Sequence, residues 1–299
     1  MQTSILGIGC ISPSGTSVES ICDALVEGRR PVVSFESILY RHKTYQVPNL
    51  QCVPFDLEGP ASAHRRASLL AKMSVFATTS ALSDANLRPG QDRRWGVIVA
   101  SGYGPESCSS KNFMRIYATS DGASPTLFTN SVHNSVASTL LRNLAFTGPA
   151  VSIADHGNLV DGGLTLAHLW LAQELVEYVI LVFGEENCPF RNYFELSRWE
   201  KLGRSIPQQD ETRRIPSEGC VCLILGPERL SSRYPKLRFA MSETSGANID
   251  ARIFLDGRPL SEKLSLQLQR RQARVSVADV LGSTPIASVF DLAIACQLE

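Results

Sequence analysis

The stretch covering residues 148–163 constrains the fold of this chain more than any other part of the sequence. It predicts a short apolar strand over residues 151–154, a tight turn at Asp155-His156-Gly157 and an amphipathic helix. The helix is indicated by residues at helical spacing: Leu164, Ala167, His168, Leu171 and Leu175. A second buried strand, residues 178–184, follows. Strands that alternate with helices in this way favour a layered α/β architecture.

The turn in this unit has the layout of a nucleophile elbow. An elbow places one residue at the N-terminus of a helix, where free backbone N–H groups and the helix dipole stabilise an anion such as a thiolate. The residue at the expected tip is Gly157. Glycine can form the turn, but it has no side chain to attack a substrate. The sequence therefore predicts the backbone of a nucleophile site without its nucleophile.

Five segments in one order resemble the β-ketoacyl synthases, the condensing enzymes of fatty-acid and polyketide assembly. They are an opening strand with a Ser12-Pro13 turn, a long helix over 65–86 that starts at Arg65-Arg66, a strand over 96–102, a crossing segment over 124–149, and the elbow with its following strand. The resemblance implies a thiolase-like layered αβαβα fold. Residues 1–227 would form a synthase-like N-terminal domain and residues 228–299 a shortened, degenerate C-terminal half.

The histidines set this chain apart from an active member of that family. Active ketosynthases use two histidines and a lysine from the later half of the chain, and here no histidine lies beyond His168. Residues 275–288 resemble the family's Lys-Ser-x-x-Gly-His-Thr motif read through Gly282. On that register Ala278 replaces the lysine and Ser283 replaces the second histidine. The resemblance thus implies that Gly157, Ala278 and Ser283 are degenerate positions and that the chain has no catalytic residue of the family.

Condensation needs a nucleophile to carry the acyl chain and donors to stabilise the enolate that forms on decarboxylation. A chain without them resembles a chain-length factor, the synthase-like subunit that pairs with an active ketosynthase in type II polyketide systems. In its short length the chain resembles the small synthase-like partners of reducing systems, such as those that build aryl polyenes. It departs from the chain-length factors at the elbow, where Gly157 replaces the glutamine often found there. The resemblance implies a heterodimer, no cofactor, and contact with the phosphopantetheine arm of an acyl carrier protein.

In synthase dimers the segment before the elbow and the elbow strand pair across a two-fold axis. Here that segment is 124–154. Its apolar residues are Phe128, Val132, Leu140, Leu141 and Phe146, and the polar pair His133 and Asn134 lies among them. A helix just upstream carries residues expected to close an acyl tunnel: Phe113, Met114, Ile116 and Tyr117. The alternative for each apolar residue is ordinary core packing.

A second hypothesis keeps an enzymatic activity. In it the chain is an acyltransferase or hydrolase that acts on acyl-carrier-protein thioesters through Cys108 or His156. Cys108 lies in a polar run expected to be a loop, without a neighbouring base. Asp155 and His156 could form an acid/base pair, but adjacent turn residues more often serve structural hydrogen bonds. His168 is expected to be a hydrogen-bonded core residue.

Composition excludes several classes of function. The 29 basic and 29 acidic residues balance, which argues against nucleic-acid binding and anionic membranes. Eight cysteines contain no C-x-x-C pair, so neither a metal site nor a disulfide framework is expected. No apolar run is long enough to span a bilayer and no signal peptide is evident, so a cytoplasmic location is expected.

The remaining elements are read from local patterns. A helix over 18–25 ends at Gly28, residues 29–64 are irregular, and residues 187–216 form a polar loop region. A strand over 219–225 places Cys220 and Cys222 on the same side of a sheet. A helix over 286–298 closes the chain.

Overall fold

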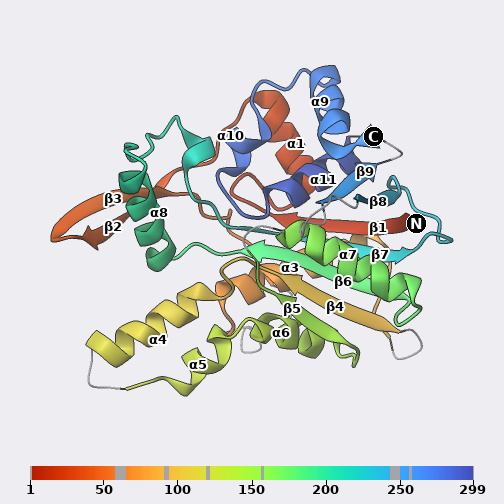
Figure 1. The fold of residues 1–299 in the computed structure, drawn as a ribbon, viewed down its shortest axis with the longest axis horizontal. Helices are drawn as coiled ribbons and strands as arrows, with labels where there is room; N and C mark the ends of the chain where they lie inside the picture. The colour runs from red at the N-terminus through yellow and green to blue at the C-terminus, as the bar shows by residue number, and fades with distance from the viewer. Residues whose placement is uncertain are drawn as a thin grey trace.

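The computed structural model describes residues 2–57, 65–90, 94–118, 122–155, 158–242, 250–255 and 258–298. Its centre is an eight-stranded mixed sheet in the order β10-β9-β8-β1-β7-β6-β4-β5 (Figure 1). The strands are β1 (Gln2–Ile11), β4 (Trp95–Ala100), β5 (Ala150–Ile153), β6 (Tyr178–Glu185), β7 (Gly219–Pro227), β8 (Leu237–Ser242), β9 (Asp250–Leu255) and β10 (Arg258–Pro259). A separate hairpin joins β2 (Ser34–Tyr40) to β3 (Lys43–Asn49).

The middle strands of the sheet are apolar along their whole length because both of their faces are covered. β4 pairs in parallel with β5 and β6, whereas β7 runs antiparallel to β6 and β1. Successive side chains of a strand point to opposite faces. On β6, Leu181 and Phe183 therefore join one core cluster, and Ile180 and Val182 join the other.

Helices form a layer on each face of the sheet. One face is covered by α3 (Leu69–Asp84) and α6 (Asn134–Leu144), and the other by α1 (Val18–Glu27), α7 (Leu159–Ala172), α9 (Leu260–Arg270), α10 (Val277–Leu281) and α11 (Ala287–Gln297). Beyond one end of the sheet lie α4 (Glu106–Ala118), α5 (Pro125–Ser131) and α8 (Pro189–Lys201) (Figure 1). A 3₁₀ turn, Thr212–Arg214, precedes β7. The short C-terminal part thus extends the same sheet through β8–β10 and completes one helix layer.

Most strands lie where the sequence predicts them. β4, β5, β6 and β7 start within one residue of the predicted positions. The first helix ends at Gly28, whose φ of 74° suits glycine. His168 lies on α7 and shares a hydrogen bond with Thr3 (Oγ1 to Nδ1, 2.8 Å), as predicted, but its side chain is half-buried and not in the core.

Three predictions about local structure are wrong. Residues 29–64 contain the β2–β3 hairpin, whose turn residues Arg41 and His42 both adopt positive φ without the glycine or asparagine that usually marks such a turn. The predicted polar loop contains α8, in which Leu196 and Trp199 are buried while most of the other side chains face outward. The long helix begins four residues later than expected, at Leu69, because Ser68 caps it by accepting a hydrogen bond from the Ala71 N–H.

Helix α3 packs on β1 at backbone contact distance. This approach is possible because β1 carries glycine at positions 7 and 9. A Cβ on Gly7 would lie 2.2 Å from the carbonyl oxygen of Ala81, and one on Gly9 would lie 2.2 Å from that of Ala77. Both oxygens belong to the backbone of α3, so neither can move without shifting the helix.

Replacement of Gly9 by alanine is expected to lower the free energy of unfolding by about 1–3 kcal/mol, as overpacked cores do. Chemical denaturation of the purified protein measures the change. Gly162→Ala is the matched control, since Gly162 lies in α7 and a Cβ there meets no atom within 4 Å. That variant should be unchanged or up to about 1 kcal/mol more stable. Equal stability of Gly9→Ala and the wild type would contradict the tight β1–α3 packing.

Candidate functional site

The predicted strand and helix of the elbow are both present. β5 ends at Ile153, and α7 begins at Leu159 after Asn158. Asp155, between them, is exposed. His156 and Gly157 lie outside the described residues, so the absence of a nucleophile at the tip rests on the sequence alone, and an acid/base pair of Asp155 with His156 stays a hypothesis.

The carboxyl ends of the parallel strands β4, β5 and β6 meet beside this elbow, where α/β proteins commonly place their sites. The Ser101 N–H, after β4, donates to the carbonyl oxygen of Ile153 (3.0 Å). Ser152 donates to the carbonyl oxygen of His133 (3.3 Å). The His133 ring lies against Gly104, where an added Cβ would be 2.7 Å from Nε2. His133 is therefore fixed beside the elbow strand, while Asn134 is exposed.

Three buried glutamates lie at the same edge of the sheet. Glu185 and Glu186 are at the end of β6, and Glu218 directly precedes β7. Each accepts hydrogen bonds from two backbone N–H groups. Glu185 binds those of Gly102 and Tyr103, Glu186 those of Leu70 (2.8 Å) and Ser107 (2.6 Å), and Glu218 those of Cys52 (2.9 Å) and Asn187 (3.2 Å). These carboxylates fix the loops around the elbow.

Arg191 of α8 is a cation beside this carboxylate cluster and is only 3% exposed. Its charge lowers the pKa values of Glu185 and Glu218, and that of Lys111 lowers the pKa of Glu186. Its guanidinium donates to the carbonyl oxygens of Glu186 (3.3 Å), Ser217 (3.1 Å) and Ser283 (3.4 Å). It also lies over the ring of Tyr103, 5.1 Å from the centroid. Arg191 thereby joins α8 to the segment before β7 and to the segment between α10 and α11.

This carboxylate cluster was not predicted from the sequence. The available signal was the pair Glu185-Glu186 directly after a continuous apolar strand, because charged residues are seldom fully buried without partners. Burial raises the pKa of Glu185 to about 7, although Arg191 and two backbone N–H groups act to lower it. Burial also raises the pKa values of Glu186 and Glu218. The cluster therefore fixes the backbone segments that donate to it, although the burial of its carboxylates is itself unfavourable.

The raised pKa of Glu185 predicts how stability depends on pH. The folded state binds the proton more tightly than the unfolded state, in which the glutamate has its ordinary pKa of about 4.5. Stability should therefore fall as pH rises from about 4.5 through about 7. In Glu185→Gln this fall is expected to be smaller, as measured by denaturant unfolding across that range. The same slope in the variant and the wild type would exclude Glu185 as its source.

Cys108 does not lie in a loop as predicted. It is in the first turn of α4, which begins at Glu106, and its side chain is buried. Burial, and then the charge of Glu186, raise the pKa of its thiol. A thiolate is the reactive form of cysteine, so this position disfavours nucleophilic chemistry. The hypothesis of an enzyme that uses Cys108 loses its structural support.

The other cysteines also behave as small core residues. All eight are free, and seven are buried. Cys220 and Cys222 face the same core cluster, as predicted. Within the described ranges no group of three or more histidine, cysteine or acidic side chains could hold a metal ion. In the same ranges no helix is both long and apolar enough to cross a membrane.

The residues predicted to close a tunnel or form an interface are exposed. On α4 the exposed fractions are 47% for Phe113, 58% for Met114, 47% for Ile116 and 74% for Tyr117. Phe128 of α5 and Val132 are 60% and 41% exposed. Core packing is therefore not their role in the isolated chain. Leu140 and Phe146, in contrast, are buried in the core between α3, α6 and the sheet, so they do not belong to this surface.

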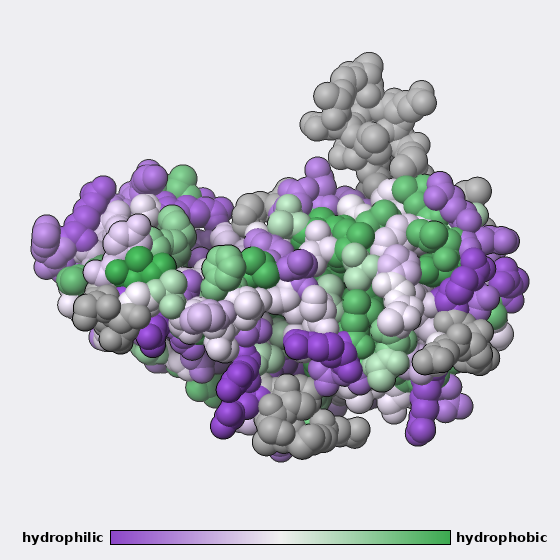
Figure 2. Space-filling view, turned by 90° about the horizontal axis from the view of Figure 1, so that it is seen from below, coloured by the Kyte–Doolittle hydropathy of each residue, from purple (hydrophilic) through white to green (hydrophobic). Residues whose placement is uncertain are grey.

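Helix α8 extends this apolar surface with rings that the sequence analysis did not single out. Phe190 lies 6.3 Å from Phe113 and 5.0 Å from Phe194, between ring centroids. Phe190 and Phe194 are 41% and 52% exposed. We call the exposed residues of these three helices the α4–α5–α8 surface. Figure 2, seen from the side on which α5 and α6 lie, shows green apolar groups between polar ones across this side of the molecule.

The two degenerate positions of the C-terminal part, Ala278 and Ser283, have different surroundings. Ala278 is exposed on α10. Ser283, just beyond α10, is exposed at its side chain, but its carbonyl oxygen accepts from Arg191 and from the Ser217 N–H (3.0 Å). Ser283 therefore adjoins the carboxylate cluster through its backbone.

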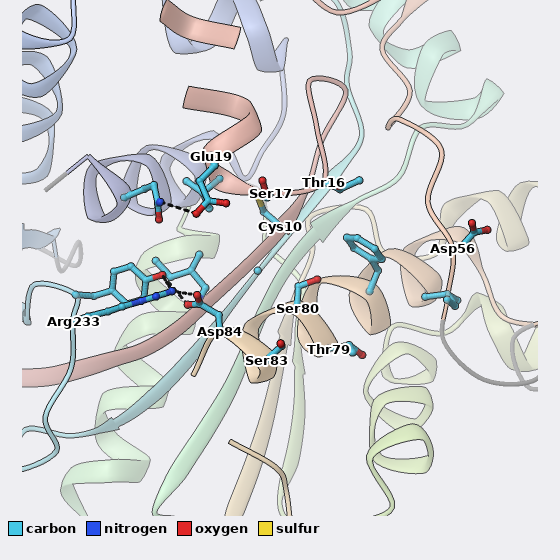
Figure 3. Close-up of a pocket in the computed structure, with 17 residues that line it drawn as sticks. Cys10, Thr16, Ser17, Glu19, Asp56, Thr79, Ser80, Ser83, Asp84 and Arg233 are labelled. Atoms are coloured by element: carbon cyan, nitrogen blue, oxygen red, sulfur yellow. Dashed lines mark hydrogen bonds and ion pairs between the residues drawn. The ribbon is translucent and has the colours of Figure 1, made fainter. Parts of the chain in front are cut away.

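A hollow of about 630 Å³ lies beside β1, with three strands between it and β5 (Figure 3). Two of its charged groups, Asp84 and Arg233, form an ion pair. Asp84 faces Arg233 and accepts from the N–H of Ile8 (2.9 Å) and the hydroxyl of Tyr234 (2.7 Å). Glu19 accepts from Gln297 (3.1 Å). The hollow therefore does not belong to the elbow site, despite its size.

The fold, in which β5 and α7 follow one another at the carboxyl ends of the parallel strands, defines a layered α/β protein. Residues 51–203 match the family model described as "Beta-ketoacyl synthase, N-terminal domain", and the chain belongs to the β-ketoacyl synthase family. No curated protein matches the sequence.

Solved structures confirm the thiolase-like fold. The ishigamide ketosynthase/chain length factor is 12% identical, with a TM-score of 0.65 over 100% of this chain and 92% of that chain. A type II polyketide acyl-carrier protein in complex with its ketosynthase, AntDE:AntF, contains a chain that is 13% identical, with a TM-score of 0.66 over 99% and 90%. The ketosynthase ApeO in complex with its chain length factor ApeC, from Xenorhabdus doucetiae, gives 16% identity and a TM-score of 0.53 over 82% and 85%.

Proposed function

We propose that this chain is a non-condensing partner of an active β-ketoacyl synthase, similar to a chain-length factor, in type II polyketide, aryl polyene or fatty-acid-like biosynthesis. The observation that carries the proposal is the exposed α4–α5–α8 surface, which lies beside the elbow in a chain whose last histidine is His168. The chain keeps the shape around a synthase site and lacks the family's reactive groups.

Strand β5 supports a paired subunit. Among the described residues it is the last strand of the sheet and pairs with β4 alone, so its other edge presents backbone N–H and C=O groups. Such an edge is a template for a strand of another chain. Phe113, Tyr117 and Phe128 stand out from the neighbouring helices. Exposed aromatic residues of this kind are enriched in protein interfaces and often dominate their binding energy.

Two of the similar structures contain ketosynthases with chain length factors, and a third contains a ketosynthase with its acyl-carrier protein. Assembly with an active ketosynthase fits this likeness. Helices α4 and α6 beside the elbow offer an acidic carrier protein three cations, Lys111, Arg115 and Arg142, while the exposed Asp155 of the elbow opposes them. A carrier protein's phosphopantetheine arm would then reach the partner's nucleophile, with no cofactor held by this chain.

Co-expression tests the proposal. The chain is expected to co-purify with its cognate ketosynthase as a heterodimer by size-exclusion chromatography, and to change the length of the products that the ketosynthase releases. The chain alone should not be labelled by an acyl thioester. Covalent labelling that disappears in Cys108→Ala or His156→Ala would instead identify an acyltransferase or hydrolase.

A further inference from the structure

A second hollow, of about 540 Å³, lies between α9 and α11, which pack side by side (Figure 1). None of its residues takes part in the elbow, the carboxylate cluster or the α4–α5–α8 surface. Much of its wall is apolar and comes from Leu264, Leu268, Ala273 and Val275. The polar lining consists of Ser261, Ser265, Gln269, Gln272 and one carboxylate, Asp291. We call it the α9–α11 pocket.

Asp291 is the unusual residue of this pocket. Its side chain is half-buried on α11, and within the described ranges it has neither a hydrogen-bond donor nor a cation paired with it. Arg270 and Arg271 of the α9 end and Arg274 just beyond are exposed, and none of them forms an ion pair with it. Burial alone raises the pKa of Asp291 to about 6. A carboxylate held in such surroundings is unfavourable unless a cation neutralises it.

The lining selects a class of ligand. Apolar side chains favour an aliphatic chain, and a single carboxylate favours one positive charge. An anionic ligand would be repelled by Asp291. A bare metal ion would find one carboxylate and no further acidic, histidine or cysteine ligand in the pocket lining. An organic cation with an aliphatic chain satisfies both halves of the site.

We propose that the α9–α11 pocket binds an alkylammonium group, with the aliphatic chain against Leu264 and Leu268 and the ammonium on the carboxylate of Asp291. The group can belong to a free amine or to a lysine side chain of another protein. Serine hydroxyls and glutamine amide oxygens of the wall can accept the remaining ammonium hydrogens. This site is independent of the proposed partner function.

Binding should depend on pH in a defined direction. The amine stays protonated below about pH 10, whereas Asp291 loses its charge below its pKa of about 6. The ammonium binds the ionised carboxylate, so affinity should be constant above that value. It should weaken about tenfold at one pH unit below it.

The test uses the purified chain with n-hexylammonium chloride and, as an uncharged analogue, hexan-1-ol. At about pH 8 the ammonium is expected to raise the Tm saturably and to give a binding isotherm by calorimetry, while hexan-1-ol gives neither. At about pH 5 the calorimetric affinity should fall about tenfold. Asp291→Asn should abolish the effect, and Asp210→Asn, at an exposed loop carboxylate, should retain it.

Capped lysine, as its N-acetyl methylamide, distinguishes the two sources of the ammonium. Binding of hexylammonium alone assigns the site to free amines, and binding of capped lysine with equal or higher affinity assigns it to a protein side chain. The proposal is overturned if hexan-1-ol shifts the Tm as hexylammonium does, if Asp291→Asn still binds, or if no saturable binding occurs. Should Asp291→Asn fail to fold, unchanged wild-type affinity between the two pH values would overturn it equally.

Discussion

Replacement of Phe128 by aspartate is expected to weaken the heterodimer with the active ketosynthase by about 30- to 100-fold, which corresponds to about 2–3 kcal/mol. Phe128 is 60% exposed on α5, so the substitution should leave the isolated chain folded. In a complex the aspartate would lose its hydration inside an apolar interface without a partner cation. Surface plasmon resonance on the purified subunits measures the loss directly.

Tyr117→Asp on α4, with 74% exposure, should have an effect of the same sign. Leu175→Asp serves as the matched control. Leu175 is 50% exposed but precedes the amino end of β6, whereas α4 and α5 lie beyond the carboxyl ends of the parallel strands. Its substitution should leave the dissociation constant within about twofold. If all three variants bind alike, the α4–α5–α8 surface is not the interface.

The sequence could predict the central strands of the sheet because they are buried on both faces. Runs such as residues 178–184 and 219–225 leave little room for another structure. The strand and the helix on either side of the elbow were also predictable, since they differ sharply in apolar period. Exposure of Phe113 and Tyr117 was not predictable, because the same helical spacing of apolar residues describes a core helix and a docking helix.

The missed features have physical reasons as well. Helix α8 carries rings and charges around most of its surface, so its pattern is typical of neither a core helix nor a loop. The turn at Arg41 and His42 lacks the residues that favour positive φ. The carboxylate cluster depends on residues far apart in the sequence, such as Glu185 and Ser283, and their proximity follows from the sheet order rather than from any local motif.

Arg191 offsets part of the buried negative charge of that cluster. Its replacement should therefore lower the free energy of unfolding more than any other substitution proposed above. Arg191→Met keeps most of the side-chain volume but removes the cation that faces Glu185 and Glu218, together with three hydrogen bonds to carbonyl oxygens. Within the described ranges Arg191 forms no direct ion pair, but its charge lowers the pKa values of Glu185 and Glu218. Its removal leaves these buried charges less well compensated, and this loss adds to that of three hydrogen bonds at about 1 kcal/mol each, for a total of about 3–5 kcal/mol. Denaturant unfolding at about pH 8 should show a loss of this size.

The same substitution should cost less at about pH 5. Without Arg191 the folded-state pKa of Glu185 rises further above about 7, so at low pH the glutamate is protonated and no longer needs the cation. What remains is the loss of the bonds to Glu186, Ser217 and Ser283, at about 1 kcal/mol each. Arg198→Met on the same helix is the control, since that side chain is 66% exposed and forms an exposed ion pair with Glu195. It should change stability by less than about 0.5 kcal/mol at either pH. An equal loss for Arg191→Met at both pH values would mean that hydrogen bonding, and not charge compensation, is what Arg191 contributes to the elbow.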